Sequence, residues 1–238
     1  MTMCATCGCG STSDHGHGHG HETVTLEQRV LAKNDHLAGH NRQWLAERDL
    51  LAINLMSSPG SGKTTLLERT ARVVPVHVIE GDQETLFDAE RIQATGRPAV
   101  QINTGAGCHL DASMVAEALR RLDPPVGAVV LIENVGNLVC PALFDLGEHA
   151  RVVITSVTEG ADKPLKYPHM FRTADVVVLN KIDLLPYVDF DLGRFGEAVS
   201  LVNPTAVVLR TSATRGDGVD GWLEWLRAAR RDVVSPVH

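Results

Sequence analysis

The segment LAINLMSSPGSGKTTLL, residues 51–67, constrains the fold of this chain more than any other. An apolar run of strand length meets a turn rich in serine, proline and glycine, and a helix then begins near Lys63. Gly60 and Gly62 let the backbone N–H groups of the turn curl around an anion, which the N-terminal end of the helix also faces. The segment therefore predicts a phosphate-binding loop between a strand and a helix.

The loop matches the pattern G-x-x-x-x-G-K-[ST], except that Ser57 takes the place of the first glycine. We expect Lys63 to reach the β- and γ-phosphates of a nucleotide and the Thr64 hydroxyl to bind Mg²⁺. An incidental glycine-rich loop is the alternative, and the strand and helix on either side disfavour it. The residues predicted to hold the phosphates are Gly60, Ser61, Gly62, Lys63, Thr64 and Thr65.

Six more apolar runs are expected to be strands, at residues 76–80, 99–103, 126–132, 152–155, 176–179 and 206–210. A composition that is 44% hydrophobic with few aromatics suits the core of an α/β domain. A helix is expected from about residue 217, with Trp222 and Leu226 in the core. These elements predict one α/β domain over residues 50–238.

Two acidic residues follow predicted strands beside the phosphate loop. Asp82 lies in EGDQET, and Glu133 comes directly after VGAVVLI. An acidic side chain in this position binds Mg²⁺ or positions water, so we expect either residue in that role; for Asp82 a solvated acidic turn is the alternative. Lys63 and Mg²⁺ are expected to stabilise charge during hydrolysis, and no arginine finger can be named.

The strand at 176–179 runs into Asn180, Lys181, Ile182 and Asp183, the N-K-x-D signature of guanine recognition. A carboxylate at Asp183 accepts two hydrogen bonds from the N1–H and amino edge of guanine, and adenine offers neither. Ser212 and Ala213 follow the last strand and are expected to contact guanine O6 through the backbone. The sequence therefore predicts GTP as the nucleotide.

Residues 1–23 have almost nothing apolar to bury and are predicted to be a disordered tail. Three thiols in C-x-x-C-x-C suit a soft metal, and a fourth donor would complete a tetrahedral Zn²⁺ or a square-planar Ni²⁺ site. The alternatives are a tail with reactive thiols and, for the histidines, an expression tag. The predicted metal ligands of the tail are Cys4, Cys7 and Cys9, followed by His15, His17, His19 and His21.

Residues 24–49 are expected to form a helical arm packed on the domain. Leu26, Val30, Leu37 and Trp44 recur at roughly helical spacing, and a break into two helices at Gly39 is left open.

Three more potential metal ligands lie within the domain. Cys108 and His109 come just before a helix that Asp111 or Ser113 is expected to cap, where the helix dipole favours a thiolate. Cys140 lies seven residues after Glu133 in the same loop. A lone cysteine before proline usually packs in a core, but the Cys-His pair favours a ligand here.

A net charge of −7 argues against a surface built for nucleic acid or anionic lipid. No apolar run approaches the length of a membrane span, and the N-terminus lacks the features of a signal peptide. We therefore expect a cytoplasmic protein, in which the five cysteines are thiolates or metal ligands and not disulfides.

With these motifs placed, the chain resembles P-loop GTPases and, more closely, the hydrogenase nickel-incorporation GTPase family, HypB. The stretches that carry the resemblance are MCATCGC, SSPGSGKTTLL, EGDQET, NTGAGCH, ENVGNLVCP, SVTEGADKPLKYP and NKIDLLP. The resemblance implies a three-layer α/β/α fold with a mostly parallel sheet of about seven strands. It also implies GTP hydrolysis, nucleotide-linked dimerisation, and delivery of nickel to the large subunit of [NiFe]-hydrogenase with a HypA-type partner.

For the metal sites, the resemblance implies tight nickel binding at Cys4, Cys7 and Cys9, and a nickel or zinc site at Cys108, His109 and Cys140. Members of the family begin Met-Cys, whereas Met1 and Thr2 precede Met3-Cys4 here. If the terminal amine is a nickel ligand, this extension removes it.

One hypothesis links the two sites, because Glu133, Gly136 and Cys140 share one loop. Ordering of that loop by the γ-phosphate and Mg²⁺ would move Cys140 relative to the other two ligands. The alternatives are a nickel or zinc storage protein with a GTPase switch, a related GTPase serving urease or a cobalamin enzyme, and a P-loop small-molecule kinase.

Overall fold

A computed structural model of the chain describes residues 19–82, 87–105 and 107–234. Its centre is a seven-stranded sheet in the order β3-β2-β4-β1-β5-β6-β7, in which every neighbouring pair is parallel. The prediction of about seven mostly parallel strands is confirmed. The strands are β1 (Leu51–Ser57), β2 (Val76–Asp82), β3 (Ala99–Asn103), β4 (Val129–Glu133), β5 (Ala150–Ser156), β6 (Val176–Asn180) and β7 (Val207–Arg210).

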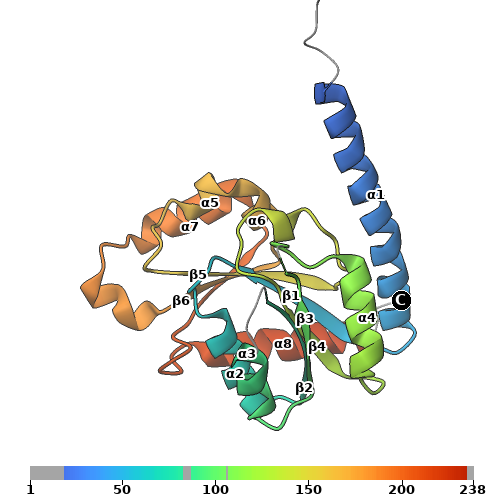
Figure 1. Ribbon diagram of the computed structural model, residues 1–238. Helices are drawn as coiled ribbons and strands as arrows, with labels where there is room; N and C mark the ends of the chain where they lie inside the picture. Colours follow the sequence, from blue (N-terminus) through green and yellow to red (C-terminus); the bar gives the residue numbers. More distant parts are fainter. Residues whose placement is uncertain (1–18, 83–86, 106, 235–238) are drawn as a thin grey trace, which may run out of the picture.

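Helices cover both faces of the sheet and give the expected three layers (Figure 1). The helices α2 (Lys63–Val73), α3 (Phe87–Gln93) and α8 (Val219–Val234) pack on one face, where Trp222 and Leu226 are buried as expected. The opposite face carries α1 (His19–Ala46), α4 (Ala112–Leu122), α6 (Pro168–Arg172) and α7 (Leu192–Val202). Three short helical segments complete the described elements: η1 (Cys140–Ala142), α5 (Lys163–Lys166) and η2 (Ile182–Tyr187).

Most strand positions agree with the sequence to within two residues, but β4 begins three residues later than residue 126, where we expected it. Val126 is 72% exposed, and Gly127 adopts a φ of +82°, so the chain turns before it enters the sheet. Every residue of β4 is buried, as expected for a central strand with helices on both faces.

The helix α1 is continuous through Gly39 and begins at His19, within the stretch 1–23 that was predicted to be disordered and ahead of residue 24, where we expected the arm to start. Its docked face is only partly the one that the apolar spacing predicted: Leu37 and Trp44 are half-buried and Trp44 packs against the core, whereas Val30 is 49% exposed. The fully buried positions are Asn34, Ala38, Asn41 and Leu45, which recur at helical spacing.

Two buried asparagines explain this difference. Asn41 Nδ2 donates to the carbonyl oxygens of Ala112 and Leu146 at 2.8 and 2.9 Å. Asn34 Nδ2 donates to the Asp145 carbonyl oxygen at 2.8 Å. Backbone polar groups of the domain are thus satisfied by polar side chains of the arm, a contact that hydrophobic periodicity does not detect.

No helix in the described ranges combines the length and the apolar character needed to cross a membrane.

Candidate functional site

The carboxyl ends of the central strands open into a cavity of about 540 Å³ around the loop between β1 and α2. In a parallel sheet this edge is where ligands bind, because the connections to the helices diverge there. The cavity is lined by residues 57–65 of the loop together with Glu80, Gly81, Asp82, Arg91, Glu133, Val135, Gly136 and Lys181. All six residues predicted to hold the phosphates are in this set.

Gly62 shows why the loop requires glycine. Its φ is +95°, and a Cβ built there would lie 2.4 Å from Nδ2 of Asn180. That amide donates to the Ser61 carbonyl oxygen at 2.9 Å, so the end of β6 contacts the loop directly. Any side chain at position 62 would separate the loop from β6.

Glu133 lies against the two residues of the loop that were expected to act on the phosphates. One carboxylate oxygen, Oε1, accepts from Lys63 Nζ at 2.8 Å and from Thr64 Oγ1 at 2.6 Å. The Glu133 side chain is 3% exposed, and its Oε2 atom is buried with no hydrogen-bond partner among the described residues. A buried carboxylate oxygen beside a threonine hydroxyl is a fitting donor set for Mg²⁺, which prefers hard oxygen ligands.

Asp82 is at the end of β2 and lines the same cavity. The sequence left Mg²⁺ or water positioning to either Asp82 or Glu133. The contacts with Lys63 and Thr64 at 2.8 and 2.6 Å are made by Glu133. Glu133 thus lies beside the two loop residues, and Asp82 faces the same cavity.

The N-K-x-D residues continue from β6 into the neighbouring turn. Asn180 Oδ1 accepts from the Ala213 N–H at 3.0 Å, which joins this segment to the Ser212-Ala213 loop. Lys181, at a φ of +60°, extends back so that its Nζ donates to the Gly60 carbonyl oxygen at 2.6 Å. The Asp183 carboxylate is 3.8 Å from Arg215 Nε. Asn180 and Lys181 thus contact the phosphate loop directly, whereas Asp183, Ser212 and Ala213 lie outside the lining of the cavity.

Sequence reasoning did not single out Glu159, although it lies in one of the quoted motifs. Its carboxylate accepts from Ser58 Oγ in the phosphate loop and from the Ser156 N–H, the latter at 3.0 Å. Lys163 Nζ lies 3.5 Å away. Glu159 therefore holds the phosphate loop to the end of β5, a contact between residues about a hundred positions apart in the chain.

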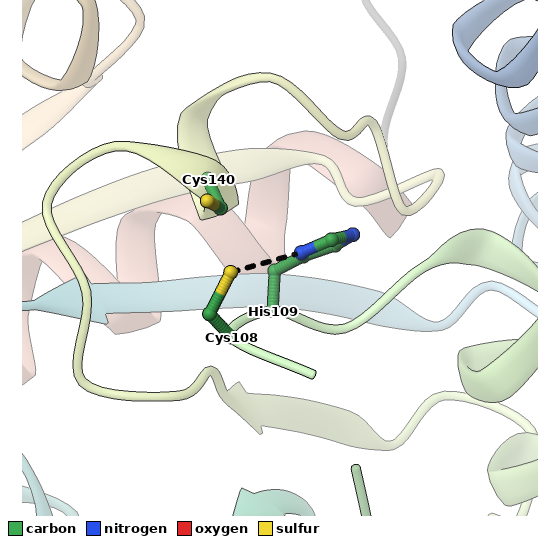
Figure 2. A group of neighbouring side chains, drawn as sticks. All are labelled: Cys108, His109 and Cys140. Atoms are coloured by element: carbon green, nitrogen blue, oxygen red, sulfur yellow. Dashed lines mark hydrogen bonds between the residues drawn. The ribbon is translucent and has the colours of Figure 1, made fainter. Parts of the chain in front are cut away.

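The structure brings together the three metal ligands expected within the domain. The ligand atoms of Cys108, His109 and Cys140 lie within 4.8 Å of one another, and Cys108 Sγ is 3.7 Å from His109 Nδ1 (Figure 2). Cys108 and His109 precede α4, whose N-cap is Asp111, and Cys140 opens η1. Thiolates and imidazole at this separation are the ligands that Ni²⁺ and Zn²⁺ accept.

The surroundings shift the pKa values of two of the three ligands in opposite directions. Burial lowers the pKa of His109, although the Asp111 carboxylate opposes the change, so the ring is neutral at pH 7 and able to bind a metal. The ring also stacks on Phe144 with 3.9 Å between centroids, which fixes its plane. The neighbouring Cys108 thiol, with burial, raises the pKa of Cys140, so this thiol keeps its proton without a metal and releases it when a metal binds.

The predicted ligands of the tail are not placed in this way. Cys4, Cys7, Cys9, His15 and His17 lie outside the described residues, and His19 and His21 fall in the first turns of α1.

Comparisons with known proteins show the family to which the chain belongs. A family model described as CobW/HypB/UreG, nucleotide-binding domain, matches residues 51–210. The chain is 56% identical to the hydrogenase maturation factor HypB of Escherichia coli strain K12 over 209 residues, covering 86% of this chain and 72% of that protein. It is also 56% identical to HypB of Azotobacter vinelandii, covering 86% of this chain and 69% of that protein.

Two solved structures share the fold at clear sequence similarity. A crystal structure of HypB from Helicobacter pylori in complex with nickel is 37% identical, with a TM-score of 0.80, and the match covers 87% of this chain and 99% of that chain. HypB from Archaeoglobus fulgidus is 41% identical, with a TM-score of 0.78, and the match covers 84% and 99% of the two chains.

Proposed function

Because this chain belongs to the CobW/HypB/UreG nucleotide-binding family and, within it, to the HypB hydrogenase maturation factors, we propose that it hydrolyses GTP and delivers nickel during maturation of [NiFe]-hydrogenase. One observation carries the proposal. A single segment joins Glu133, which contacts Lys63 and Thr64, to Cys140 in the metal cluster. Nucleotide state and metal binding are therefore coupled through residues 133–140.

Hydrolysis is assigned to the residues around the phosphate loop. Lys63 neutralises charge that develops on the β- and γ-phosphates, and the glycine-rich backbone holds them in place. The Thr64 hydroxyl and the Glu133 carboxylate would hold Mg²⁺, which supplies positive charge to the terminal phosphates when bound. When the nucleotide binds, Lys63 contacts phosphate oxygens and no longer pairs with Glu133. The start of the 133–140 segment is then free to move.

Guanine selectivity is assigned to Asp183, in reach of the loop at Ser212 and Ala213. The test is Asp183→Asn, because an amide donates a hydrogen bond where the guanine amino group also donates. We expect GDP affinity to fall by about 100-fold or more, and xanthosine diphosphate, which has a carbonyl at that position, to bind better than GDP. Titration with fluorescent GDP and XDP measures this. Unchanged GDP preference would contradict the assignment.

Nickel is the cargo, and zinc is a second ion that the same ligands accept. Cys108, His109 and Cys140 supply three donors per chain, one short of a closed tetrahedral site. Val139 and Leu143 on either side of Cys140 are 50% and 44% exposed. An exposed apolar rim around an incomplete site supports a homodimer in which a second copy covers the metal.

The remaining partners in the proposal are a HypA-type nickel chaperone and the hydrogenase large subunit. Deletion of residues 1–23 separates delivery from storage. A storage role predicts loss of nickel tolerance with hydrogenase activity largely intact, whereas delivery through the domain site predicts that Cys108→Ala lowers hydrogenase activity in cells.

The decisive experiment measures nickel stoichiometry and GTP hydrolysis together. The full chain, its Cys4→Ala/Cys7→Ala variant and its Cys108→Ala variant are each titrated with Ni²⁺ in the presence of GDP or of a non-hydrolysable GTP analogue. We expect Cys108→Ala to lose one nickel per chain or per dimer, and the domain-site affinity to differ between the two nucleotides. Equal affinities in both nucleotide states would rule out the coupling.

A further inference from the structure

Asn134 follows Glu133 directly and is completely buried. Its side-chain oxygen Oδ1 accepts from the N–H of Leu110 at 3.1 Å and from its own neighbour Val135 at 3.0 Å. Its Nδ2 donates to Asn54 Oδ1 at 3.2 Å. The side chain of Asn134 thus uses its oxygen and its nitrogen in the interior of the domain.

Leu110 links these contacts to the metal ligands, because it comes immediately after Cys108 and His109 in the chain. One amide oxygen therefore connects the residue after Glu133 with the residue after the Cys-His pair, 24 positions away in the chain. Leu110 also packs against the nucleotide cavity from the other side. A Cβ built on Gly81, which lines that cavity, would lie 2.7 Å from Leu110 Cγ.

The orientation of the Asn134 amide is dictated by a neighbouring carboxylate. Asn54 Nδ2 donates to Glu148 Oε1 at 3.2 Å, and Glu148 also accepts from Arg151 Nε at 2.7 Å and from the Leu146 N–H at 2.7 Å. An ionised carboxylate only accepts, so Asn54 must present its oxygen to Asn134. The oxygen of Asn134 is then left facing Leu110, and flipping either amide would set two like groups against each other.

We propose that Asn134 is a positioning residue that transmits the state of Glu133 to Cys108 and His109. This inference rests on the proposed function and adds a second connection to it. Movement of residues 133–140 displaces Cys140, because Cys140 is part of that segment. The hydrogen bond between Asn134 and Leu110 passes the same movement to Cys108 and His109, which directly precede Leu110. All three ligands then respond to the nucleotide, and not Cys140 alone.

The test uses the full chain with Cys4→Ala/Cys7→Ala/Cys9→Ala, so that the sulfurs of the domain alone report nickel. Ni²⁺ affinity is measured by the thiolate-to-nickel absorption band in GDP and in a non-hydrolysable GTP analogue, and the ratio of the two affinities is the readout. In Asn134→Ala we expect this ratio to fall at least about threefold toward one. The Ni²⁺ affinity measured in GDP should change by less than about threefold.

Two further variants separate positioning from general destabilisation. Asn54→Ala removes only the partner of Asn134 Nδ2 and keeps the Asn134 oxygen facing the N–H groups of Leu110 and Val135, so it should retain most of the ratio. Asn203→Ala removes another buried asparagine, whose Nδ2 donates to the carbonyl oxygens of Phe171, Arg172 and Ala174 at 2.8 to 3.2 Å. It should lower stability and leave the ratio unchanged. Urea unfolding confirms that each variant is folded in the assay.

Metal-free protein gives an independent readout. The rate at which a thiol reagent modifies Cys108 is compared in the two nucleotide states, and Asn134→Ala should abolish the difference between them. If Asn134→Ala keeps the parent ratio and the parent difference in rate, the inference is overturned while GTP hydrolysis and nickel binding still stand. A parent that fails to hydrolyse GTP or to bind nickel at the domain site overturns the proposed function, and the inference with it.

Discussion

At the scale of single residues, Glu133 has the position in which a change of charge matters most. In Glu133→Gln the neutral amide no longer neutralises Lys63 and is a poorer ligand for Mg²⁺ than a carboxylate. We expect the rate constant of GTP hydrolysis to fall by about 100-fold, the size of effect that loss of one electrostatic group in a site produces. Phosphate release under single-turnover conditions measures it.

The comparison variant is Asp82→Asn, which changes the other acidic residue of the same cavity. GDP binding by both variants is measured with a fluorescent analogue to confirm that the site is intact. A larger loss of hydrolysis in Asp82→Asn than in Glu133→Gln would reverse the assignment of roles.

The residue scale also shows which residues a sequence can single out. Lys63, Thr64 and Glu133 were predicted because each belongs to a local pattern, and Cys108, His109 and Cys140 because thiols and imidazole are rare enough to attract attention. Glu159 and Asn134 were missed, since an ordinary carboxylate and an ordinary amide gain their roles only from partners far along the chain. Choosing between Asp82 and Glu133 likewise required the distances to Lys63 and Thr64.

At the scale of elements, α1 is attached to the domain by two buried asparagines. Asn41 donates two of these hydrogen bonds. In Asn41→Ala the carbonyl oxygens of Ala112 and Leu146 lose their buried donor. We expect a loss of about 2 kcal/mol in the free energy of unfolding, because buried acceptors without partners are costly. Urea unfolding followed by circular dichroism measures the loss.

His40→Ala is the matched control, because it changes the exposed neighbour on the same turn of α1. A loss in Asn41→Ala no larger than that in His40→Ala would show that the arm is held by apolar contacts instead.

The ion pair between Arg42 and Asp145, at 2.8 Å, adds a pH-dependent attachment of the same helix. Burial raises the pKa of Asp145, but hydrogen bonds from Arg42 and the Gly147 N–H outweigh it, so the pKa lies below its ordinary value. A carboxyl group whose pKa is depressed by folding stabilises the protein fully at any pH above its pKa in the unfolded chain, which is about 3.9. This stability is lost as the pH falls through the pKa in the folded protein.

We therefore expect the free energy of unfolding to fall more steeply below about pH 4 in the parent than in Asp145→Asn. The contribution is at most about 1 kcal/mol, because the pair is partly exposed and screened by solvent. Denaturant unfolding at several pH values measures the slopes, with Asp35→Asn, an exposed change on the same helix, as the control. Parallel curves for the parent and Asp145→Asn would contradict the prediction.

The arm illustrates what element-level patterns miss. Apolar spacing located a helix near residues 24–49 and two of its half-buried positions, Leu37 and Trp44, but it missed Asn34 and Asn41, because it counts only apolar side chains as buried. The strands were easier, since a strand covered by helices on both faces is a continuous apolar run.

At the scale of the whole molecule, the sheet order places β1, β2 and β4 side by side, so that one cavity collects residues from all three and from the turn after β6. Ligand binding there should stabilise the entire domain. At a GDP concentration 100 times its dissociation constant we expect about 2.7 kcal/mol of added stability. Thermal or urea unfolding with GDP, compared with ADP at the same concentration, measures this. Equal stabilisation by ADP would contradict guanine selectivity.

The order of strands in the sheet could not be obtained from local patterns, because it depends on which apolar faces pair in three dimensions. The family resemblance supplied the expectation of a parallel sheet with three layers, and the structure confirms it.

The close approach of Gly62 and Asn180 has a consequence for anyone who wishes to redesign this protein. Asn180, the first residue of the N-K-x-D motif, also donates a hydrogen bond to the phosphate-binding loop and packs against Gly62. The preference for guanine can then be changed by substituting Asp183. Replacing the whole N-K-x-D motif would also remove the contact of Asn180 with the phosphate-binding loop and weaken phosphate binding. Asn180 should therefore be kept in any such redesign, because it contacts the phosphate loop as well.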